Sequence, residues 1–368
     1  MAEPIRARGV IARTPGAPGE IEEFLIDQPE AGEALVRIVA SGVCHTDLSA
    51  KNGVFGTDGF PFLLGHEGSG IVEAVGEGVT NVQVGDHVIL AWRAPCGECR
   101  FCKVGKPHLC CASLNAHKGM KTLDGEVLTP ILGIGTFCTH TLVHSKQCIP
   151  VRDDLPPEQM SLIGCGVMTG VGAALYTADV QPGESVAVIG CGGVGDSVIM
   201  GARLAGATTI IAVDLDPRKL EWATQFGATH TVNAREGDPV AAIKEITGGH
   251  GVDASFEAVG RAETLETAIM CRDLAGRCVV IGVADQQATY ELPIAKFFDI
   301  GGSLRVSWYG DCLPTRDFPL LAAWYEQGQL DLDRVVTRVI PLEDHDEAFH
   351  AMERGETLRS VIRLDLDA

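Results

Sequence analysis

Four cysteines within fifteen residues constrain this chain more than any other feature. They lie in Cys96-Gly-Glu-Cys99-Arg-Phe-Cys102 and at Cys110. Thiols this crowded in one short loop cannot all pack as small apolar side chains, and four inward-facing thiolates form a closed tetrahedral cage for one Zn²⁺. The alternatives are an iron–sulfur cluster or disulfides in a secreted protein. We expect zinc, which would tie residues 93–112 into one small lobe.

The bulk properties exclude several classes of partner. A chain of 368 residues is too long for one hydrophobic core and indicates two domains. A formal charge of −20, from 29 basic and 49 acidic residues, argues against nucleic acid and against anionic membranes. The stretch 1–8 lacks the apolar core of a signal peptide, and the most apolar segment, 185–199, is interrupted by glycine and aspartate. Thirteen cysteines without an export signal then indicate a reducing, cytoplasmic location.

The first third of the sequence is rich in short β-like segments joined by glycine turns. Strand patterns occur at 34–40, at 70–75 and at 82–90, and the last of these contains the turn pair Gly85-Asp86. Many short strands with such turns are typical of a compact β-barrel-like domain. We expect that domain at the start of the chain.

From about residue 185 the chain alternates short apolar strands with helices. The predicted strands cover 185–189, 208–213, 253–258 and 278–281, and the predicted helices cover 194–205 and 220–226. This alternation is typical of an α/β fold with a Rossmann-type doubly wound parallel sheet, covered by helices on both faces. The last part of the chain leaves the pattern, with a helix at 346–353 and a strand at 360–364.

A glycine-rich segment between a predicted strand and a predicted helix indicates a dinucleotide site. It contains Gly190, Gly192, Gly193, Val194 and Gly195 in the pattern G-x-G-x-x-G. The glycines allow a tight turn and let a pyrophosphate approach the helix N-terminus. Asp214 ends the next strand, where a carboxylate can bind both ribose hydroxyls of NAD and repel the 2′-phosphate of NADP. Lys219, which lies close by, is counted among the cofactor-binding residues, and we expect NAD.

Two further segments of the β-rich region carry residue types that bind metals. They are Cys44-His45-Thr46-Asp47 and Gly65-His66-Glu67-Gly68, and Cys165 stands alone just before the alternating region. Their spacing is no metal motif, because a lone cysteine is usually a small buried side chain and a lone histidine is usually structural. The residues alone leave both interpretations open.

Taken together, these motifs resemble the medium-chain, zinc-dependent alcohol dehydrogenases over nearly the whole chain. The segment 65–68, the four-cysteine lobe, the glycine motif and Asp214 occur in that family's order and approximate spacing. The resemblance implies a GroES-like β-barrel catalytic domain at 1–166, a Rossmann NAD-binding domain at 167–309 and a C-terminal return to the catalytic domain at 310–368. It also implies NAD and two Zn²⁺ per subunit, in a homodimer or a homotetramer.

The same resemblance implies a catalytic zinc held by Cys44, His66 and Cys165, with Glu67 as a nearby alternative ligand. Asp47 would orient His66 through a hydrogen bond, as metal-bound histidines generally require. Three protein ligands leave one zinc position open for an alcohol, which is a far stronger acid beside the cation than in water. The expected reaction is hydride transfer between an alcohol and NAD.

Four more residues are implied to contact the cofactor. His45 would contact the pyrophosphate, and Arg359 would reach the phosphates from the C-terminal segment. Gly282 and Val283 would lie beside the nicotinamide. We therefore expect the cofactor to be bound by residues from both domains.

The resemblance also implies roles beside the substrate. Thr46 would lie beside the alcohol oxygen and begin a proton relay, and Trp92 would form part of the pocket wall. Some relatives end the relay at a histidine where this chain has Ser49, whose hydroxyl passes a proton but is no base near neutral pH. The terminal base is left open between His45, water and the cofactor ribose.

Three segments, 114–137, 164–168 and 307–314, resemble one branch of the family, the mycothiol-dependent formaldehyde dehydrogenases or S-nitrosomycothiol reductases. Glutathione-dependent relatives grip a glutathione carboxylate with an arginine shortly after the fourth cage cysteine, and that place holds Leu114 and Asn115 here. We expect oxidation of a thiol adduct such as S-hydroxymethylmycothiol. The alternatives are a general aliphatic or aryl alcohol dehydrogenase and a nicotinoprotein with tightly bound NAD. A non-enzymatic relative is disfavoured, because all three implied zinc ligands are present.

Overall fold

The computed structural model describes residues 3–54, 56, 58–117, 119–285 and 287–364. The chain divides into two compact units, with Met1–Cys165 and Leu313–Ala368 in unit 1 and Gly166–Cys312 in unit 2. The divisions after Cys165 and Cys312 lie beside the expected domain borders at 166/167 and 309/310. The ends of the expected first and last segments, residues 1–2 and 365–368, lie outside the described residues.

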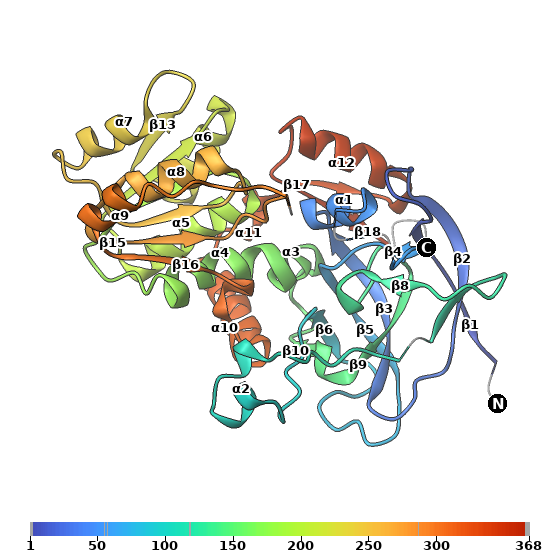
Figure 1. Cartoon of the computed structure of the whole chain (residues 1–368). Coiled ribbons are helices and arrows are strands. Elements are labelled where there is room, and N and C mark those ends of the chain that lie inside the picture. The colour runs from blue at the N-terminus through green and yellow to red at the C-terminus, as the bar shows by residue number, and fades with distance from the viewer. Residues whose placement is uncertain (1–2, 55, 57, 118, 286, 365–368) are drawn as a thin grey trace. The chain divides into compact units, whose positions relative to one another are not determined.

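Unit 1 contains two β-sheets with short helices around them (Figure 1). A five-stranded sheet has the order β7-β2-β1-β4-β8, and a seven-stranded sheet has the order β10-β6-β5-β3-β18-β17, with β9 also paired to β3. The strands are β1 (Ile5–Ala12), β2 (Glu20–Ile26), β3 (Glu33–Gly42), β4 (Phe62–Leu63), β5 (Gly68–Val75), β6 (His87–Leu90), β7 (Met120–Thr122), β8 (Thr129–Pro130), β9 (His140–His144), β10 (Cys148–Val151), β17 (Val336–Ile340) and β18 (Arg359–Arg363). The helices are α1 (His45–Lys51), α2 (Arg100–Lys103), α3 (Pro157–Leu162), α10 (Pro314–Glu326), α11 (Leu332–Val335) and α12 (His345–Glu353).

The central strand of the larger sheet, β3, positions the site. It pairs with β5, β9 and β18 and is buried along almost its whole length. Strand β18 comes from the C-terminal segment and pairs antiparallel with the end of β3, so that Val361 lies opposite Gly42. The N–H group of Val43 then donates to the carbonyl of Ser360 at 2.9 Å. The pairing therefore brings Arg359, at the start of β18, close to the residues that follow β3.

One expected strand is shorter than the apolar pattern indicated. The sequence analysis expected a strand at 82–90, and the structure has β6 at His87–Leu90. The Asp86 carboxylate accepts a hydrogen bond from the N–H group of Gln83 at 2.9 Å, and Gly85 has a φ of +94°. A residue with this φ leaves the extended conformation, which glycine does without steric penalty. The turn therefore ends the extended segment before β6 begins.

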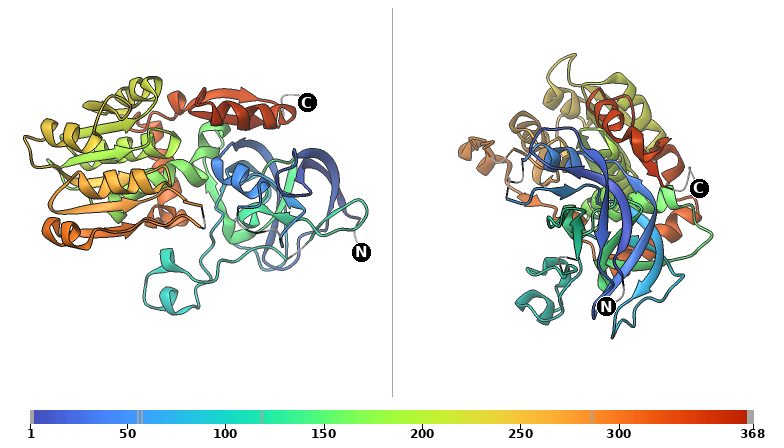
Figure 2. Two further views of the ribbon diagram at one scale, coloured as in Figure 1. Left: turned by 45° about the horizontal axis from the view of Figure 1, so that its top comes forward. Right: turned by 90° about the vertical axis from the view of Figure 1, so that its right-hand side faces the viewer.

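Unit 2 is built on a six-stranded sheet in which every neighbouring pair is parallel, in the order β13-β12-β11-β14-β15-β16. Its strands are β11 (Ser185–Ile189), β12 (Thr209–Asp214), β13 (His230–Asn233), β14 (Val252–Glu257), β15 (Arg272–Val280) and β16 (Ser303–Val306). Its helices are α4 (Met168–Gly172), α5 (Gly193–Ala205), α6 (Pro217–Phe226), α7 (Pro239–Ile246), α8 (Ala262–Met270) and α9 (Ile294–Ile300), and they cover both faces of the sheet (Figure 2). The predicted doubly wound parallel sheet is confirmed.

The strand order of unit 2 reverses at β11, which lies between β12 and β14. In open α/β sheets the crevice outside the carboxyl ends of the strands at such a point is the usual ligand site. The segment that follows β11 there is the glycine motif. The fold therefore places the predicted dinucleotide motif where ligands of such sheets bind.

One helical segment has the length and composition of a membrane span. Among the described residues, 157–177 form such a segment, with a mean hydropathy of 1.4 in its most apolar window, but 78% of that window is buried inside the protein. A mostly buried apolar helix is also what the core of a soluble protein contains. The segment 185–199, which the sequence analysis named as most apolar, is instead divided between β11 and α5 by the glycine turn.

Candidate functional site

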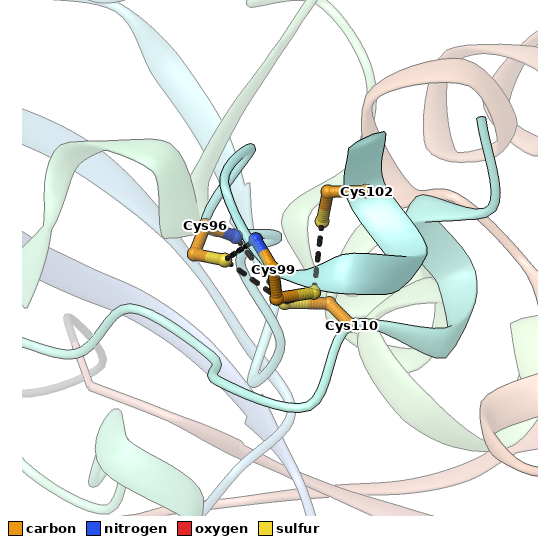
Figure 3. A group of neighbouring side chains, drawn as sticks. All are labelled: Cys96, Cys99, Cys102 and Cys110. Atoms are coloured by element: carbon orange, nitrogen blue, oxygen red, sulfur yellow. Dashed lines mark hydrogen bonds between the residues drawn. The ribbon is translucent and has the colours of Figure 1, made fainter. Parts of the chain in front are cut away.

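The four cysteines of the lobe lie together in unit 1, around the short helix α2 (Figure 3). The sulfur atoms are 3.6 Å apart for Cys99 and Cys102, 3.9 Å for Cys99 and Cys110, and 3.6 Å for Cys96 and Cys110. Four sulfurs that each lie about 2.3 Å from one zinc ion are about 3.8 Å from one another, by the geometry of a tetrahedron. The cluster therefore has the size of a site for a single metal ion.

The same distances decide between the alternative occupants. All thirteen cysteines are free, and sulfur separations of 3.6 to 3.9 Å in the cluster are far longer than a disulfide bond of about 2.05 Å. The space between the sulfurs fits one ion and not a cluster of several irons and sulfides. The donor set of four thiols in a closed tetrahedron fits zinc.

Backbone N–H groups stabilise thiolates in this lobe. Cys96 Sγ accepts hydrogen bonds from the N–H groups of Glu98 at 3.4 Å and of Cys99 at 3.3 Å. The N–H groups of Cys102 and Cys111 lower the pKa of Cys99 to about 5. Loss of hydration raises the pKa of Cys102 to about 12 in the absence of a cation. A dication at the centre would ionise the remaining thiols, because thiolates are the ligands that bind metal.

A second group of metal-ligating side chains lies in unit 1. Cys44, His66, Glu67 and Cys165 offer ligand atoms that all lie within 4.8 Å of one another. Cys44 precedes α1, His66 and Glu67 lie between β4 and β5, and Cys165 lies in the π-helical turn Ile163–Val167. Such turns are frequent at functional sites. Three segments far apart in the sequence thus supply one compact set of donors.

Hydrogen bonds hold His66 in one orientation. Its Nδ1 donates to Asp47 Oδ1 at 2.9 Å, and the same oxygen accepts from the N–H group of Gly65 at 3.0 Å. Both side chains are fully buried. His66 Nε2 is buried as well and, among the described residues, has no hydrogen-bond partner. A metal ion would satisfy this buried lone pair, so the donor set of Cys44, His66 and Cys165 fits a zinc ion with three protein ligands.

The charges of this cluster favour thiolate at Cys44. A hydrogen bond from the Cys165 thiol lowers the pKa of Cys44 well below its ordinary value, and the charges of His66 and Arg359 also outweigh the opposing effect of burial. The hydrogen bond to Cys44, together with burial, raises the pKa of Cys165. Burial lowers the pKa of His66, but Asp47 and Cys44 outweigh it and raise that pKa well above its usual range. Without a metal ion, the cluster therefore favours a thiolate at Cys44 and a proton on His66, and a metal ion would displace that proton.

Glu67 and Arg359 form a buried ion pair beside this cluster. Burial raises the pKa of Glu67 to about 7, although the guanidinium of Arg359 opposes the shift. A Cβ at Gly42, at the end of β3, would lie 2.2 Å from Glu67 Oε2, so a side chain there would displace the carboxylate of the ion pair. The sequence analysis missed this contact of Arg359, which it expected at the cofactor phosphates; the strand pairing of β18 with β3 creates it.

We predict that Asp47→Asn weakens zinc binding at the second cluster by about 10- to 100-fold. The amide keeps the size of the carboxylate but is a weaker acceptor for His66 Nδ1, so the ring is held less firmly. Chelator competition with metal analysis should show loss of one zinc before the other. Asp86→Asn, in the turn before β6, is the control and should behave as the wild type. Equal zinc affinity in Asp47→Asn would show that Asp47 does not orient the ligand.

The glycine motif of unit 2 has the backbone geometry of a phosphate-binding turn. Gly190 has a φ of +98°, and a Cβ at Gly195 would lie 1.8 Å from the Gly190 carbonyl oxygen. The Asp214 carboxylate accepts from the N–H group of Cys191 at 2.8 Å and from that of Asp216 at 3.0 Å. Asp214 is therefore fixed against the turn, at the end of β12, with its carboxylate half-buried.

The other predicted residues lie at the expected ends of their elements. In unit 2, Lys219 lies in α6, and Gly282 and Val283 follow β15, where Val283 is 73% exposed. A Cβ at Gly282 would lie 2.1 Å from the N atom of Gly260, so two loops at the carboxyl edge of the sheet pack closely. The contacts predicted between these residues and the cofactor stay predictions.

Three more predicted residues lie in unit 1, and two of them directly follow the ligand residue Cys44. His45 and Thr46 begin α1, directly after Cys44, with His45 exposed and Thr46 half-buried. Trp92 follows β6 and packs half-buried against the apolar cluster of unit 1. Their roles toward cofactor and substrate stay predictions.

Sequence reasoning missed a residue that shapes the dinucleotide edge of unit 2. Glu257 ends β14 and is buried, and its Oε1 accepts from the N–H groups of Val259 at 2.9 Å and Gly260 at 2.8 Å and from the hydroxyl of Thr264 at 2.8 Å. The carboxylate thereby fixes the loop that follows the strand. An acidic residue directly after the apolar strand residues was the signal that could have found it.

Comparison with known proteins identifies the family. A family model for the alcohol dehydrogenase GroES-like domain matches residues 30–153, and one for zinc-binding dehydrogenase matches residues 193–327. The S-(hydroxymethyl)glutathione dehydrogenase of Synechocystis sp. is 39% identical over 370 residues, which cover 97% of this chain and 100% of that protein. The chain belongs to the zinc-dependent medium-chain alcohol dehydrogenase family. The resemblance drawn from the motifs is thereby confirmed, as is the fold of a GroES-like domain with a Rossmann-type sheet.

Solved structures of this alcohol dehydrogenase family have the same fold. An alcohol dehydrogenase zinc-binding domain protein from Burkholderia ambifaria has a TM-score of 0.93 and 36% identity, covering 98% of this chain and 100% of that one. Benzyl alcohol dehydrogenase from Acinetobacter calcoaceticus has a TM-score of 0.91 and 33% identity, covering 98% of this chain and 99% of that one. The chain is thus an alcohol dehydrogenase of a family that uses NAD and zinc, and its two cysteine-containing clusters are the candidate zinc sites.

Proposed function

We propose that this alcohol dehydrogenase oxidises the hydroxymethyl adduct of a low-molecular-weight thiol with NAD. The observation that carries the reaction is the cluster of half-buried Cys44 and Cys165 with buried His66, whose Nε2 has no hydrogen-bond partner among the described residues. The thiol-adduct class is supported by relatives named S-(hydroxymethyl)glutathione dehydrogenase at 37–39% identity over their full length. We assign the open-site chemistry to this cluster and a structural role to the four-cysteine cage.

The division of roles follows from the donor sets. The cage has four thiols and thus no position for a substrate, whereas three ligands leave one position open. When bound, zinc supplies a Lewis acid for the substrate oxygen and NAD supplies the hydride acceptor. Asp47 holds His66 in its tautomer through Nδ1. Thr46, in the first turn of α1, is the proposed first group of the proton relay.

We further propose that the thiol is uncharged at the end that contacts the segment after the cage, as in mycothiol. By the family resemblance, Leu114 and Asn115 stand where glutathione-dependent relatives have an arginine. The N–H group of Leu114 donates to the Ala94 carbonyl at 2.9 Å, and Asn115 Oδ1 accepts from Gln147 Nε2 at 3.2 Å. Both residues are thus engaged within unit 1 and offer no positive charge to a carboxylate.

Oxidation of an aryl alcohol is the second candidate function. It is favoured by the likeness to benzyl alcohol dehydrogenase from Acinetobacter calcoaceticus, with its TM-score of 0.91. An aryl alcohol needs no thiol-binding group, so the absence of an arginine after the cage is equally compatible with it. The two candidates share the metal cluster and differ only in the substrate.

Initial rates of NADH formation distinguish the two. The substrates are formaldehyde alone, formaldehyde with mycothiol, formaldehyde with glutathione, and a panel of benzylic and aliphatic alcohols. We expect turnover of formaldehyde only with mycothiol and a kcat/KM for that adduct well above those of the alcohols. Thiol-independent turnover of benzyl alcohol with no adduct oxidation would establish the second candidate instead.

We predict that Asp214→Asn reduces the preference for NAD over NADP by about 10- to 100-fold. A hydrogen bond to a charged group contributes about 1.5–3 kcal/mol, and the charge that repels a 2′-phosphate is lost as well. The measurement is the ratio of kcat/KM for the two cofactors. Asp216→Asn is the matched control, because it removes a neighbouring charge while asparagine still caps α6. An unchanged ratio in Asp214→Asn would show that another group sets the preference.

We also propose a homodimer that forms through strand β16. This strand is the edge of the unit 2 sheet, where it pairs with β15 and, within the described residues, with no second strand. Its Leu304 and Val306 are 42% and 67% exposed. Exposed apolar edges invite pairing with another strand, and a twofold axis makes two such edges antiparallel.

The expected result is that Val306→Glu yields a monomer by light scattering after gel filtration, while the wild type is a dimer. Leu274→Glu, a similarly exposed apolar residue (74%) of unit 2 in β15, is the control and should remain dimeric. A dimeric Val306→Glu variant would place the interface elsewhere.

A cytoplasmic location is likewise proposed, supported by thirteen cysteines without a disulfide.

A further inference from the structure

Asp196 is a buried carboxylic acid that neither the metal chemistry nor the glycine motif uses. It lies in the first turn of α5, directly after Gly195, and its side chain has no exposure to solvent. Among the described residues, neither Oδ1 nor Oδ2 has a hydrogen-bond partner. Burying a polar group without a hydrogen-bond partner is unfavourable, so the stability of the fold does not account for this side chain.

The ionisable groups that interact electrostatically with Asp196 belong to the predicted dinucleotide site. They are Asp214 at the end of β12, Lys219 on α6 and the thiol of Cys191 in the glycine turn. Helix α4, which packs on α5, contains no titratable residue. Burial raises the pKa of Asp196 well above its ordinary value, Asp214 adds to that shift, and Lys219 opposes it. The acid therefore remains protonated at pH values where an exposed aspartate is ionised.

An ionised Asp196 would oppose a bound dinucleotide. The pyrophosphate of a dinucleotide lies at the N-terminus of the helix after the glycine motif, which is α5 here. Its negative charges would then face a second negative charge in the first turn of the same helix. The region has lost its water, so this repulsion is poorly screened. The neutral acid has no such effect.

We propose that Asp196 is a proton-binding residue of the cofactor site, whose neutral form accepts the dinucleotide and whose ionised form weakens its binding. This proposal rests on the proposed function, because it takes NAD(H) as the ligand of unit 2. No covalent step is involved: the proton stays on the Asp196 carboxyl in the complex and returns to solvent when the cofactor leaves at high pH. By linkage, the cofactor binds together with a proton wherever free Asp196 is ionised.

The affinity for the dinucleotide should fall as the pH rises. Bound dinucleotide favours the protonated acid, so the free protein must take up a proton on binding at pH values above the pKa of Asp196. The Kd for NADH should therefore rise with pH, by up to about tenfold per pH unit for one linked proton. Below that pKa the Kd should be independent of pH.

Calorimetric titration of the intact protein with NADH tests this from about pH 6 to about pH 9. Repeating the titration in buffers of different ionisation enthalpy gives the number of protons taken up. We expect the wild type to take up a number of protons that increases toward one as the pH rises. Asp196→Asn should take up no proton on binding, and its Kd for NADH should not change with pH. Asp196→Ala, which removes both buried oxygens, provides the same test if the amide variant is poorly folded. Asp238→Asn, at the N-cap of α7, is the control and should keep the wild-type uptake.

The outcomes separate this inference from the function. If the wild type does not bind NADH at all, the proposed function fails. If NADH binds with no proton uptake, or if Asp196→Asn keeps the wild-type uptake and Kd profile, only the inference is overturned. If the uptake persists in Asp196→Asn, the linked proton belongs to another group.

Discussion

Cys44→Ser is expected to lower kcat by about a thousandfold or more and to remove one of two zinc ions. The hydroxyl is a poor zinc ligand, because the thiolate that the surroundings of Cys44 favour is no longer available. A Lewis acid contributes several kcal/mol to the transition state, and each 1.4 kcal/mol lost is about a factor of ten in rate. Steady-state kinetics and metal analysis of the same preparation give both quantities.

The Cys44 variant should otherwise resemble the wild type. Its affinity for NADH should be retained, because the dinucleotide motif lies in unit 2. Cys148→Ala, which changes a buried cysteine of β10 outside both clusters, is the control and should keep its zinc and its activity. Loss of NADH binding together with turnover would mean that Cys44 is structural. Full activity with one zinc would contradict the assignment of the catalytic metal.

The second large effect concerns the cage. Cys102→Ser should lose the other zinc ion and lower the free energy of unfolding by about 3 kcal/mol or more, since structural zinc contributes directly to folding. At about 2 °C per kcal/mol, that loss lowers Tm by about 6 °C or more. Differential scanning calorimetry with metal analysis measures it. At temperatures below its Tm, where the variant is folded, it should retain the zinc bound by Cys44, His66 and Cys165 and its catalytic rate.

Cys111→Ser is the matched control for the cage. Cys111 is exposed and directly follows Cys110, but its sulfur is not one of the clustered ligand atoms. This variant should keep two zinc ions and the wild-type Tm. If Cys102→Ser abolished turnover at temperatures where it is folded, the cage would take part in the chemistry and the assignment of roles would be wrong.

The cage could be predicted from the sequence because its ligands lie on one short segment. Cys96, Cys99, Cys102 and Cys110 are close in sequence, so local spacing alone carries the metal chemistry. The other cluster has no such local signal. Cys44, His66 and Cys165 come from three separate segments, after β3, before β5 and in the π-helical turn, and only the fold brings them together. Their grouping was predicted from the family resemblance and not from their spacing.

The same distinction holds in unit 2. The glycine motif and Asp214 are predictable, because a strand, a turn and a helix in succession define the site locally. Asp196 and Glu257 were not predicted. An aspartate in a helix or a glutamate at the end of a strand is ordinarily a surface residue. Only the packing of α5 and of the loop after β14 shows that both are buried. The ion pair of Arg359 with Glu67 was missed because it depends on a strand pairing between the ends of the chain.

The most direct test of the catalytic assignment is anomalous X-ray diffraction at the zinc absorption edge from crystals of the intact protein. We predict two zinc peaks per chain, one inside the four-cysteine cage and one bound by Cys44, His66 and Cys165. The second should have protein ligands at about 2.0–2.3 Å and one coordination position open to solvent or substrate. A peak in the cage alone, or a second zinc closed by four protein ligands, would contradict the account.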